Sequence, residues 1–184
     1  LRSLQLGSSL RLLEEEATLE KFEAEAADYR ILHLSTHAKA DSAGRPPRIE
    51  FFDRALYLPE VYALDLQADL VTLSACETGL GSFQAGEGVL SLSRGFVYAG
   101  AASLVASLWT VNEESTARLF GHFYDLIREG EERGAALRKA KIAYLDNEDI
   151  NSFRKSPYYW TGFVYYGNNE PVVLSGKGGF WHWI

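Results

Sequence analysis

The chain has 184 residues, enough for one domain with a sizeable core, and its apolar fraction of 47% is that of a globular protein rather than a disordered one. The formal net charge of −7 argues against direct nucleic-acid binding, which usually requires a basic surface. A single cysteine excludes an intramolecular disulfide.

The start of the chain lacks the basic, apolar and small-residue pattern of a signal peptide, and no run approaches the roughly 20 apolar residues of a membrane span. We therefore expect a cytoplasmic protein that does not enter the membrane. The sequence contains no methionine, from which we expect an excised piece of a longer protein or a processed start.

Helical and extended patterns alternate along the chain. Residues 1–16 are rich in leucine but lack clean helix caps, and we assign them to the remnant of an upstream region. Thr18 is placed to cap a helix that runs to about Asp28. The elements predicted after it are strands 30–36 and 48–52, a hairpin arm 53–58, a short helix 59–64, strand 70–75, helix 87–99, strand 103–109, a helix from Thr110 or Asn112 to 128, helix 134–145 and strand 160–166.

This alternation predicts an α/β fold with a mostly parallel sheet flanked by helices. We assign the domain to residues 17–167. Residues 168–184 form a C-terminal tail of uncertain structure, for which we consider a docking strand, a partner segment and a disordered extension.

The residues with the clearest chemical potential follow two of the predicted strands. His37 follows the strand that begins at 30, and Cys76 follows the strand that begins at 70, just before a glycine-rich loop. Active groups of open α/β sheets gather at the carboxyl ends of strands, and neighbouring strands lie about 4.8 Å apart. If these two strands are neighbours, the imidazole can take the thiol proton and later protonate a leaving amine.

Other interpretations of these residues remain open. A lone cysteine can equally be a small buried hydrophobic residue. His33 is better explained as a hydrogen-bonded core histidine, and Glu77 either shapes substrate charge or is a solvated loop acid. Ser74 lacks the Gly-x-Ser-x-Gly turn of a serine hydrolase.

Nucleotide and metal sites find no support in the sequence. The spacing of Gly81 and Gly86 matches the start of a phosphate loop, but Glu87 and Gly88 stand where Lys and Ser or Thr are needed. One cysteine and scattered histidines do not make a zinc site. We expect no cofactor and no metal.

Five motifs, in order, resemble the CHAT domain, a caspase-like family often found behind tetratricopeptide repeats. The resemblance covers about residues 17–167. The motifs are residues 33–38 (HLSTHA), 73–79 (LSACETG), 86–89 (GEGV), 106–109 (ASLW) and 159–163 (YWTGF).

The resemblance implies a caspase-hemoglobinase-like three-layer sandwich, related to caspases and separase, with a His37–Cys76 dyad. The backbone N–H groups of Ala38 and Cys76 would form the oxyanion hole, and Ala38 stands where relatives often have glycine. The substrate would be a protein or peptide. The resemblance also suggests that four residues line the specificity pocket: Ser74, Glu77, Ser107 and Trp109.

The function expected from the sequence is therefore that of a cysteine endopeptidase that forms a thioester acyl-enzyme. The resemblance implies activation by a protein partner or an upstream repeat region, and a role in bacterial defence or programmed cell death. The alternative is a non-catalytic caspase-like interaction or scaffold module.

Overall fold

A computed structural model describes residues 9–39, 45–74, 85–173 and 179–183, with the backbone alone described for residues 9, 85–90 and 179–183. Its centre is a six-stranded sheet in the order β1-β9-β2-β6-β7-β8. Each neighbouring pair from β1 to β7 is parallel, and β8 pairs antiparallel with β7. The strands are β1 (Ser9–Leu12), β2 (Tyr29–Leu34), β6 (Leu70–Leu73), β7 (Ser103–Ser107), β8 (Phe163–Gly167) and β9 (Gly179–Trp183).

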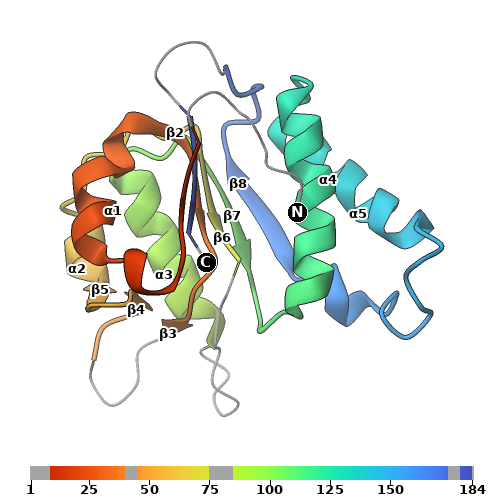
Figure 1. Ribbon diagram of the computed structural model, residues 1–184, viewed down its shortest axis with the longest axis horizontal. Coiled ribbons are helices and arrows are strands. Elements are labelled where there is room, and N and C mark those ends of the chain that lie inside the picture. Colours follow the sequence, from red (N-terminus) through yellow and green to blue (C-terminus); the bar gives the residue numbers. More distant parts are fainter. Residues whose placement is uncertain (1–8, 40–44, 75–84, 174–178, 184) are drawn as a thin grey trace.

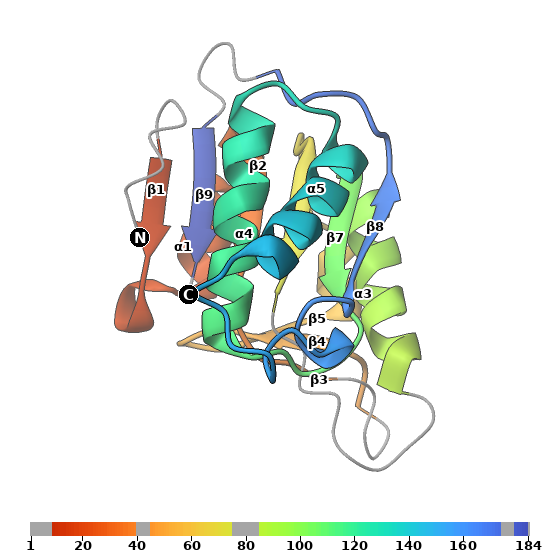
Figure 2. The same cartoon turned by 90° about the vertical axis from the view of Figure 1, so that its right-hand side faces the viewer.

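Helices cover both faces of this sheet, which gives the three-layer sandwich expected from the sequence (Figure 1). One face is covered by α1 (Leu19–Glu25), α2 (Leu58–Val61) and α3 (Ala85–Tyr98), and the other by α4 (Glu113–Arg128) and α5 (Arg133–Asp146). Figure 2, turned by 90°, shows α4 and α5 lying across the face of the central strands.

Each face of the sheet has its own core because successive strand residues point to opposite sides. On the side of α1 and α3, Leu73 and Ala106 pack with Phe22 and Phe96. On the side of α4 and α5, the apolar residues Ile31, Leu70 and Val105 pack with helix residues that include Phe120, Phe123 and Ala136.

A second, three-stranded sheet lies next to the carboxyl ends of the main strands. It consists of β3 (Ala38–Lys39), β4 (Arg48–Glu50) and β5 (Ala55–Tyr57), paired antiparallel in that order. Figure 1 shows it at the lower end of the molecule, where β3 follows β2. The backbone after β2 is therefore held in a hairpin.

Local signals in the sequence set the ends of several helices. Thr18 accepts a hydrogen bond from the Lys21 amide and caps α1, and Asn112, rather than Thr110, caps α4 through the Ser115 amide. Gly100 follows α3 at a φ of +110°, a conformation that residues with a Cβ rarely adopt.

Two segments expected to lie outside the domain contribute strands to its main sheet. Residues 9–12, within the expected upstream remnant, form edge strand β1, and residues 179–183, within the expected tail, form β9 between β1 and β2. Sequence periodicity did not show this because a strand's partners are distant in the chain. The strands expected at 30–36 and 103–109 end earlier, at Leu34 and Ser107.

Candidate active site

The two strands that lead to His37 and Cys76 are direct neighbours. Strand β2 pairs parallel with β6, with Leu34 opposite Leu73. The pairing continues one residue further, because the Ser74 amide donates to the Leu34 carbonyl at 3.0 Å. His37 is three residues beyond Leu34, and Cys76 is three residues beyond Leu73. The sequence predicts that the thiol and the imidazole meet if these two strands are neighbours, and the strand order meets that condition.

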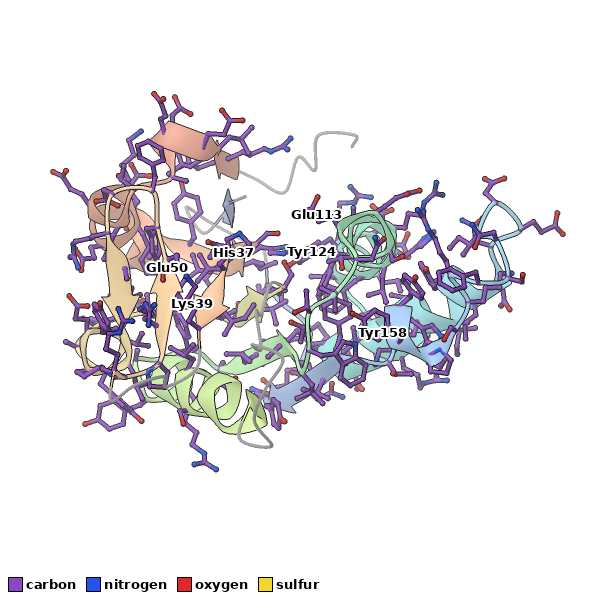
Figure 3. The ribbon with its side chains drawn as sticks, turned by 90° about the horizontal axis from the view of Figure 1, so that it is seen from below. His37, Lys39, Glu50, Glu113, Tyr124 and Tyr158 are labelled. Carbon is purple, nitrogen blue, oxygen red and sulfur yellow. The ribbon has the colours of Figure 1, made fainter. Side chains whose placement is uncertain are left out.

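The backbone of His37 is fixed where the chain enters the small sheet. Its carbonyl accepts a hydrogen bond from the Glu50 amide at 2.8 Å, and its side chain is exposed. Figure 3 labels His37 beside Lys39 and Glu50, which form an ion pair at 3.5 Å. The histidine is thus held by its main chain while its imidazole reaches solvent.

Ala38 presents its backbone N–H away from the small sheet. In antiparallel strands, hydrogen-bonded pairs of opposite residues alternate with pairs that are not hydrogen-bonded. The Glu50 amide donates to the His37 carbonyl, so the next pair, Ala38 opposite Ile49, is not hydrogen-bonded. Strand β3 is the edge of its sheet, so no further strand of that sheet takes up the Ala38 N–H. The Ala38 amide is therefore directed away from β4, and the hydrogen bonds among the described residues include none that it donates.

Cys76, which is also the second expected oxyanion donor, and Glu77 lie outside the described residues. Their assigned roles remain predictions.

Ser74 and His33 contact each other in the interior. His33 is 4% exposed and Ser74 is 2% exposed, and His33 Nε2 lies 2.7 Å from Ser74 Oγ. The prediction of a hydrogen-bonded core histidine is confirmed. The Ser74 side chain is committed to this bond, and its assignment to substrate binding stays a prediction.

Ser107 and Trp109 lie at the carboxyl end of β7. The Ser107 side chain is fully buried, and its hydroxyl has no hydrogen-bond partner among the residues that the structure describes. Buried hydroxyls are normally hydrogen-bonded, so this one has unused capacity.

Contacts with Tyr158 and Gly162 fix the Trp109 side chain. Its indole N–H donates to the Tyr158 carbonyl at 3.0 Å, and the Tyr158 hydroxyl donates to the Thr110 carbonyl at 2.9 Å. The two rings stack with centroids 6.3 Å apart. Gly162 makes room for the indole, since a Cβ there would lie 2.8 Å from Trp109 Cε2. Tyr158, labelled in Figure 3, is itself half exposed.

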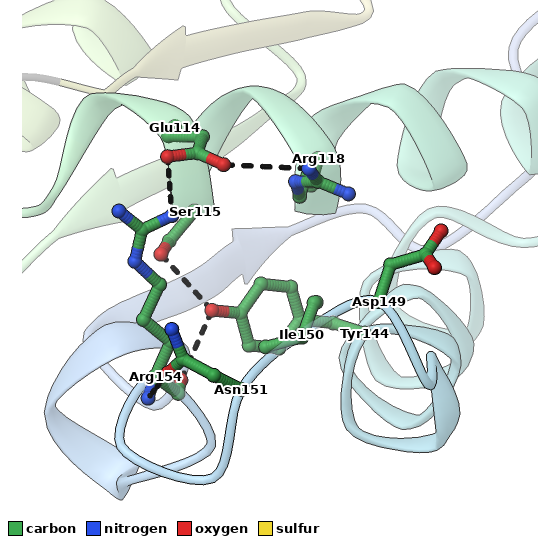
Figure 4. Close-up of a pocket in the computed structure, with 8 residues that line it drawn as sticks. All are labelled: Glu114, Ser115, Arg118, Tyr144, Asp149, Ile150, Asn151 and Arg154. Carbon is green, nitrogen blue, oxygen red and sulfur yellow. Dashed lines mark hydrogen bonds and ion pairs between the residues drawn. The ribbon is translucent and has the colours of Figure 1, made fainter.

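A small polar pocket lies between α4, the end of α5 and the loop after it (Figure 4). Its cavity of about 20 Å³ has room for a single water molecule. The Tyr144 hydroxyl lies 2.9 Å from Ser115 Oγ and 3.0 Å from the Arg154 carbonyl. The hydrogen bond from Arg154 holds the pKa of the Glu114 carboxyl below its usual value. None of the residues predicted to form the site lines this pocket.

Local sequence patterns do not single out Tyr124, Tyr158 or Gly162. The partners of Tyr124 and Tyr158 lie 91 and 49 positions away in the chain, beyond the reach of local sequence patterns. Gly162 lies within one of the five family motifs, and that placement was the available signal.

The part of the chain that the structure describes offers neither a metal cluster nor a membrane-spanning helix. No group of three or more His, Cys, Asp or Glu residues there could hold a metal ion. No helix there has the length and apolarity needed to cross a bilayer.

The parallel sheet between two helical layers, with a histidine after β2, defines the class of caspase-like α/β sandwiches. The family model described as the CHAT domain matches residues 2–168, and the chain belongs to this family of caspase-like peptidases. The match begins within the segment that contributes β1.

The chain is also similar to a human protein named tetratricopeptide repeat protein 28. The two are 29% identical over 122 residues, which cover 64% of this chain and 5% of the human protein. This chain therefore corresponds to a small part of that relative, whose name agrees with the link between CHAT domains and repeats.

Proposed function

We propose that the chain is a cysteine endopeptidase in which His37 is the general base and Cys76 the nucleophile. The observation that carries this proposal is the parallel pairing of β2 with β6, in register at Leu34 and Leu73. Because each functional residue follows its strand by three positions, both start from the same edge of the sheet. Membership of a caspase-like peptidase family supports the same roles.

In the proposed reaction, the His37 imidazole takes the proton of the Cys76 thiol, and the thiolate attacks the carbonyl carbon of the scissile peptide bond. The Ala38 amide, directed away from β4, donates to the oxyanion that forms, together with the Cys76 amide. The C–N bond then breaks, and the imidazolium gives its proton to the departing amine. Water, deprotonated by the same imidazole, hydrolyses the thioester and restores the thiol.

The substrate in this proposal is a protein or peptide bound beside the end of β7. The Ser107 hydroxyl, which has no hydrogen-bond partner among the described residues, supports a polar contact with the substrate. The Trp109 indole, held by Tyr158, supports an apolar wall. Ser74 and Glu77 complete the proposed pocket. We further propose that the activity is cytoplasmic and is switched on by a protein partner or an upstream repeat region. A role in bacterial defence or programmed cell death belongs to the same proposal.

The experiment is cleavage of a diverse peptide library by the wild-type chain and by two variants, Cys76→Ala and His37→Ala, with and without candidate activating partners. Both variants are expected to fold and to lose cleavage. An active preparation that keeps its cleavage with Cys76→Ala would refute the proposal. If the wild type cleaves nothing and an active-site-directed peptide chloromethylketone never labels Cys76, the non-catalytic interaction module becomes the better description.

A further inference from the structure

A network of hydrogen-bonded polar side chains lies in the core next to the candidate site. Its members come from three elements: His33 of β2, Thr72 of β6 with Ser74 just beyond it, and Tyr124 of α4. Each is 4% exposed or less. His33 lies opposite Thr72 in the sheet, and the alternation of strand residues puts Thr72 and Ser74 on the face that α4 covers.

Hydrogen bonds connect these four side chains without a break. Tyr124 OH lies 2.9 Å from Thr72 Oγ1 and 2.9 Å from His33 Nδ1. The other ring nitrogen, His33 Nε2, lies 2.7 Å from Ser74 Oγ. Both nitrogens of one imidazole are therefore bonded, one to a helix and the other to the end of the neighbouring strand.

The Tyr124 phenol determines which groups donate and which accept in these hydrogen bonds. Burial raises the pKa of Tyr124 far above its usual value, so the phenol keeps its single proton. When that proton goes to Thr72, His33 Nδ1 donates to the phenol oxygen, and Nε2 accepts from the Ser74 hydroxyl. The Ser74 side chain is then held from inside the core.

The surroundings make this arrangement costly to disturb. The apolar cluster on this face includes Ile31, Val105 and Phe120, and the Phe120 ring lies 5.1 Å from the His33 ring. Polar groups in such a place are tolerated only when they are hydrogen-bonded, so the loss of one member leaves another without its partner. The network consequently favours one position of Ser74.

Ser74 is fixed at two points. Its amide donates to the Leu34 carbonyl, and its hydroxyl bonds to His33, both on the strand that leads to His37. Cys76 follows Ser74 by two residues. Small displacements matter here, because an error of about 1 Å in the placement of reacting groups can cost about a hundredfold in rate.

We propose that His33 and Tyr124 are positioning residues, which hold Ser74, two residues before Cys76 in the sequence, in place relative to the strand that leads to His37. This inference rests on the proposed function for its catalytic meaning. It assigns a role to Tyr124, which belongs to a helix on the far side of the network and is no part of the proposed dyad.

The test uses the single cysteine, because alkylation by iodoacetamide reports on Cys76 without any peptidase assay. The variant is Tyr124→Phe, which removes one hydroxyl. The matched control is Tyr144→Phe, which removes another buried hydroxyl; this one is bonded to Ser115 and Arg154 and to none of the four side chains of the network. Thermal midpoints of both variants show whether each is folded and comparably destabilised.

The expected result is that only Tyr124→Phe moves the pH profile of alkylation toward the ordinary thiol pKa of about 8.5, with alkylation about tenfold slower at neutral pH. Ser74→Ala is expected to do the same. The double variant with Tyr124→Phe and Ser74→Ala should be alkylated no more slowly than the slower of the two single variants, because both changes break the same network. In cleavage by Tyr124→Phe, kcat is expected to fall while KM stays near the wild-type value.

Three outcomes would overturn the inference: an unchanged alkylation profile in Tyr124→Phe, an equal shift in Tyr144→Phe, or additive effects in the double variant. A wild type that cleaves no peptide with any candidate partner, and whose Cys76 the chloromethylketone never labels, would contradict the peptidase proposal instead. The alkylation comparison would still decide whether Tyr124 controls the state of the thiol.

Discussion

Asp69, at the amino end of β6, connects two arginines from different layers of the fold. Arg30, in β2, donates to both of its carboxylate oxygens, at 2.7 and 2.8 Å. Arg133, at the start of α5, lies 3.6 Å from the same carboxylate and donates to the Asp69 carbonyl at 2.9 Å. The distances alone suggest that Arg30 is the more important partner.

The burial of the two arginine side chains predicts instead that Arg133 is the more important partner. The Arg30 side chain is 40% exposed, so its ion pair is largely screened and contributes about 1 kcal/mol or less. The Arg133 side chain is 3% exposed, and removal of the carboxylate leaves its charge buried without an ion pair, which costs about 3–5 kcal/mol. Arg133 keeps neutral acceptors in Ser103 and the Asn168 carbonyl, so the lower end of that range applies. We expect Asp69→Ala to lower the free energy of unfolding by about 3 kcal/mol and Arg30→Ala by about 1 kcal/mol or less.

The assay is urea denaturation followed by tryptophan fluorescence, with the slope m compared between variants to confirm that the same surface unfolds. Arg128→Ala removes an exposed ion pair with Asp125 within α4 and serves as the control, with no measurable change expected. Equal losses for Asp69→Ala and Arg30→Ala would refute the reasoning from burial. Cys76 alkylation by folded Asp69→Ala should match the wild type, because Asp69 lies at the opposite end of β6.

Two glycine substitutions test other parts of the structure. Gly100→Ala would place a Cβ 2.0 Å from the Leu66 carbonyl oxygen at a φ of +110°, so the free energy of unfolding should fall by more than the roughly 1–3 kcal/mol of backbone strain alone. Gly121→Ala, inside α4 with nothing within 4 Å of the added Cβ, is its control and should not destabilise the protein in the same urea titration. Gly162→Ala would displace the Trp109 indole, and in the peptide-library assay it should change the preferred substrate side chains; an unchanged preference would remove Trp109 from the proposed pocket.

The sequence was informative wherever structure depends on neighbours in the chain. The apolar run at 70–75 indicated a buried strand, which forms as β6 over Leu70–Leu73. Thr18 and Asn112 indicated helix starts, and the helix predicted at 87–99 ends just before Gly100, which has a positive φ. These signals are local, because caps and positive φ angles satisfy backbone groups within a few residues. The five motifs also carried the family, which the match over residues 2–168 shows.

The candidate site was predictable only in part. The sequence places His37 and Cys76 after predicted strands, but it does not state that those strands are neighbours. That fact is a hydrogen-bonded pairing between residues about 39 positions apart, and strand periodicity carries no information about the partner. The direction of the Ser74 side chain was missed for the same reason, since its partner His33 lies 41 positions away.

The sequence by itself therefore determined the alternating elements, their ends and the residues able to do chemistry, because each of these follows from local periodicity and residue type. Only the tertiary structure decided that β9 is inserted between β1 and β2, that β2 lies against β6, and that Tyr124 reaches His33 from α4. Strand order and contacts between layers depend on which apolar faces are buried against each other and which backbone groups become hydrogen-bonded. Both depend on the whole folded molecule and not on a local stretch of sequence.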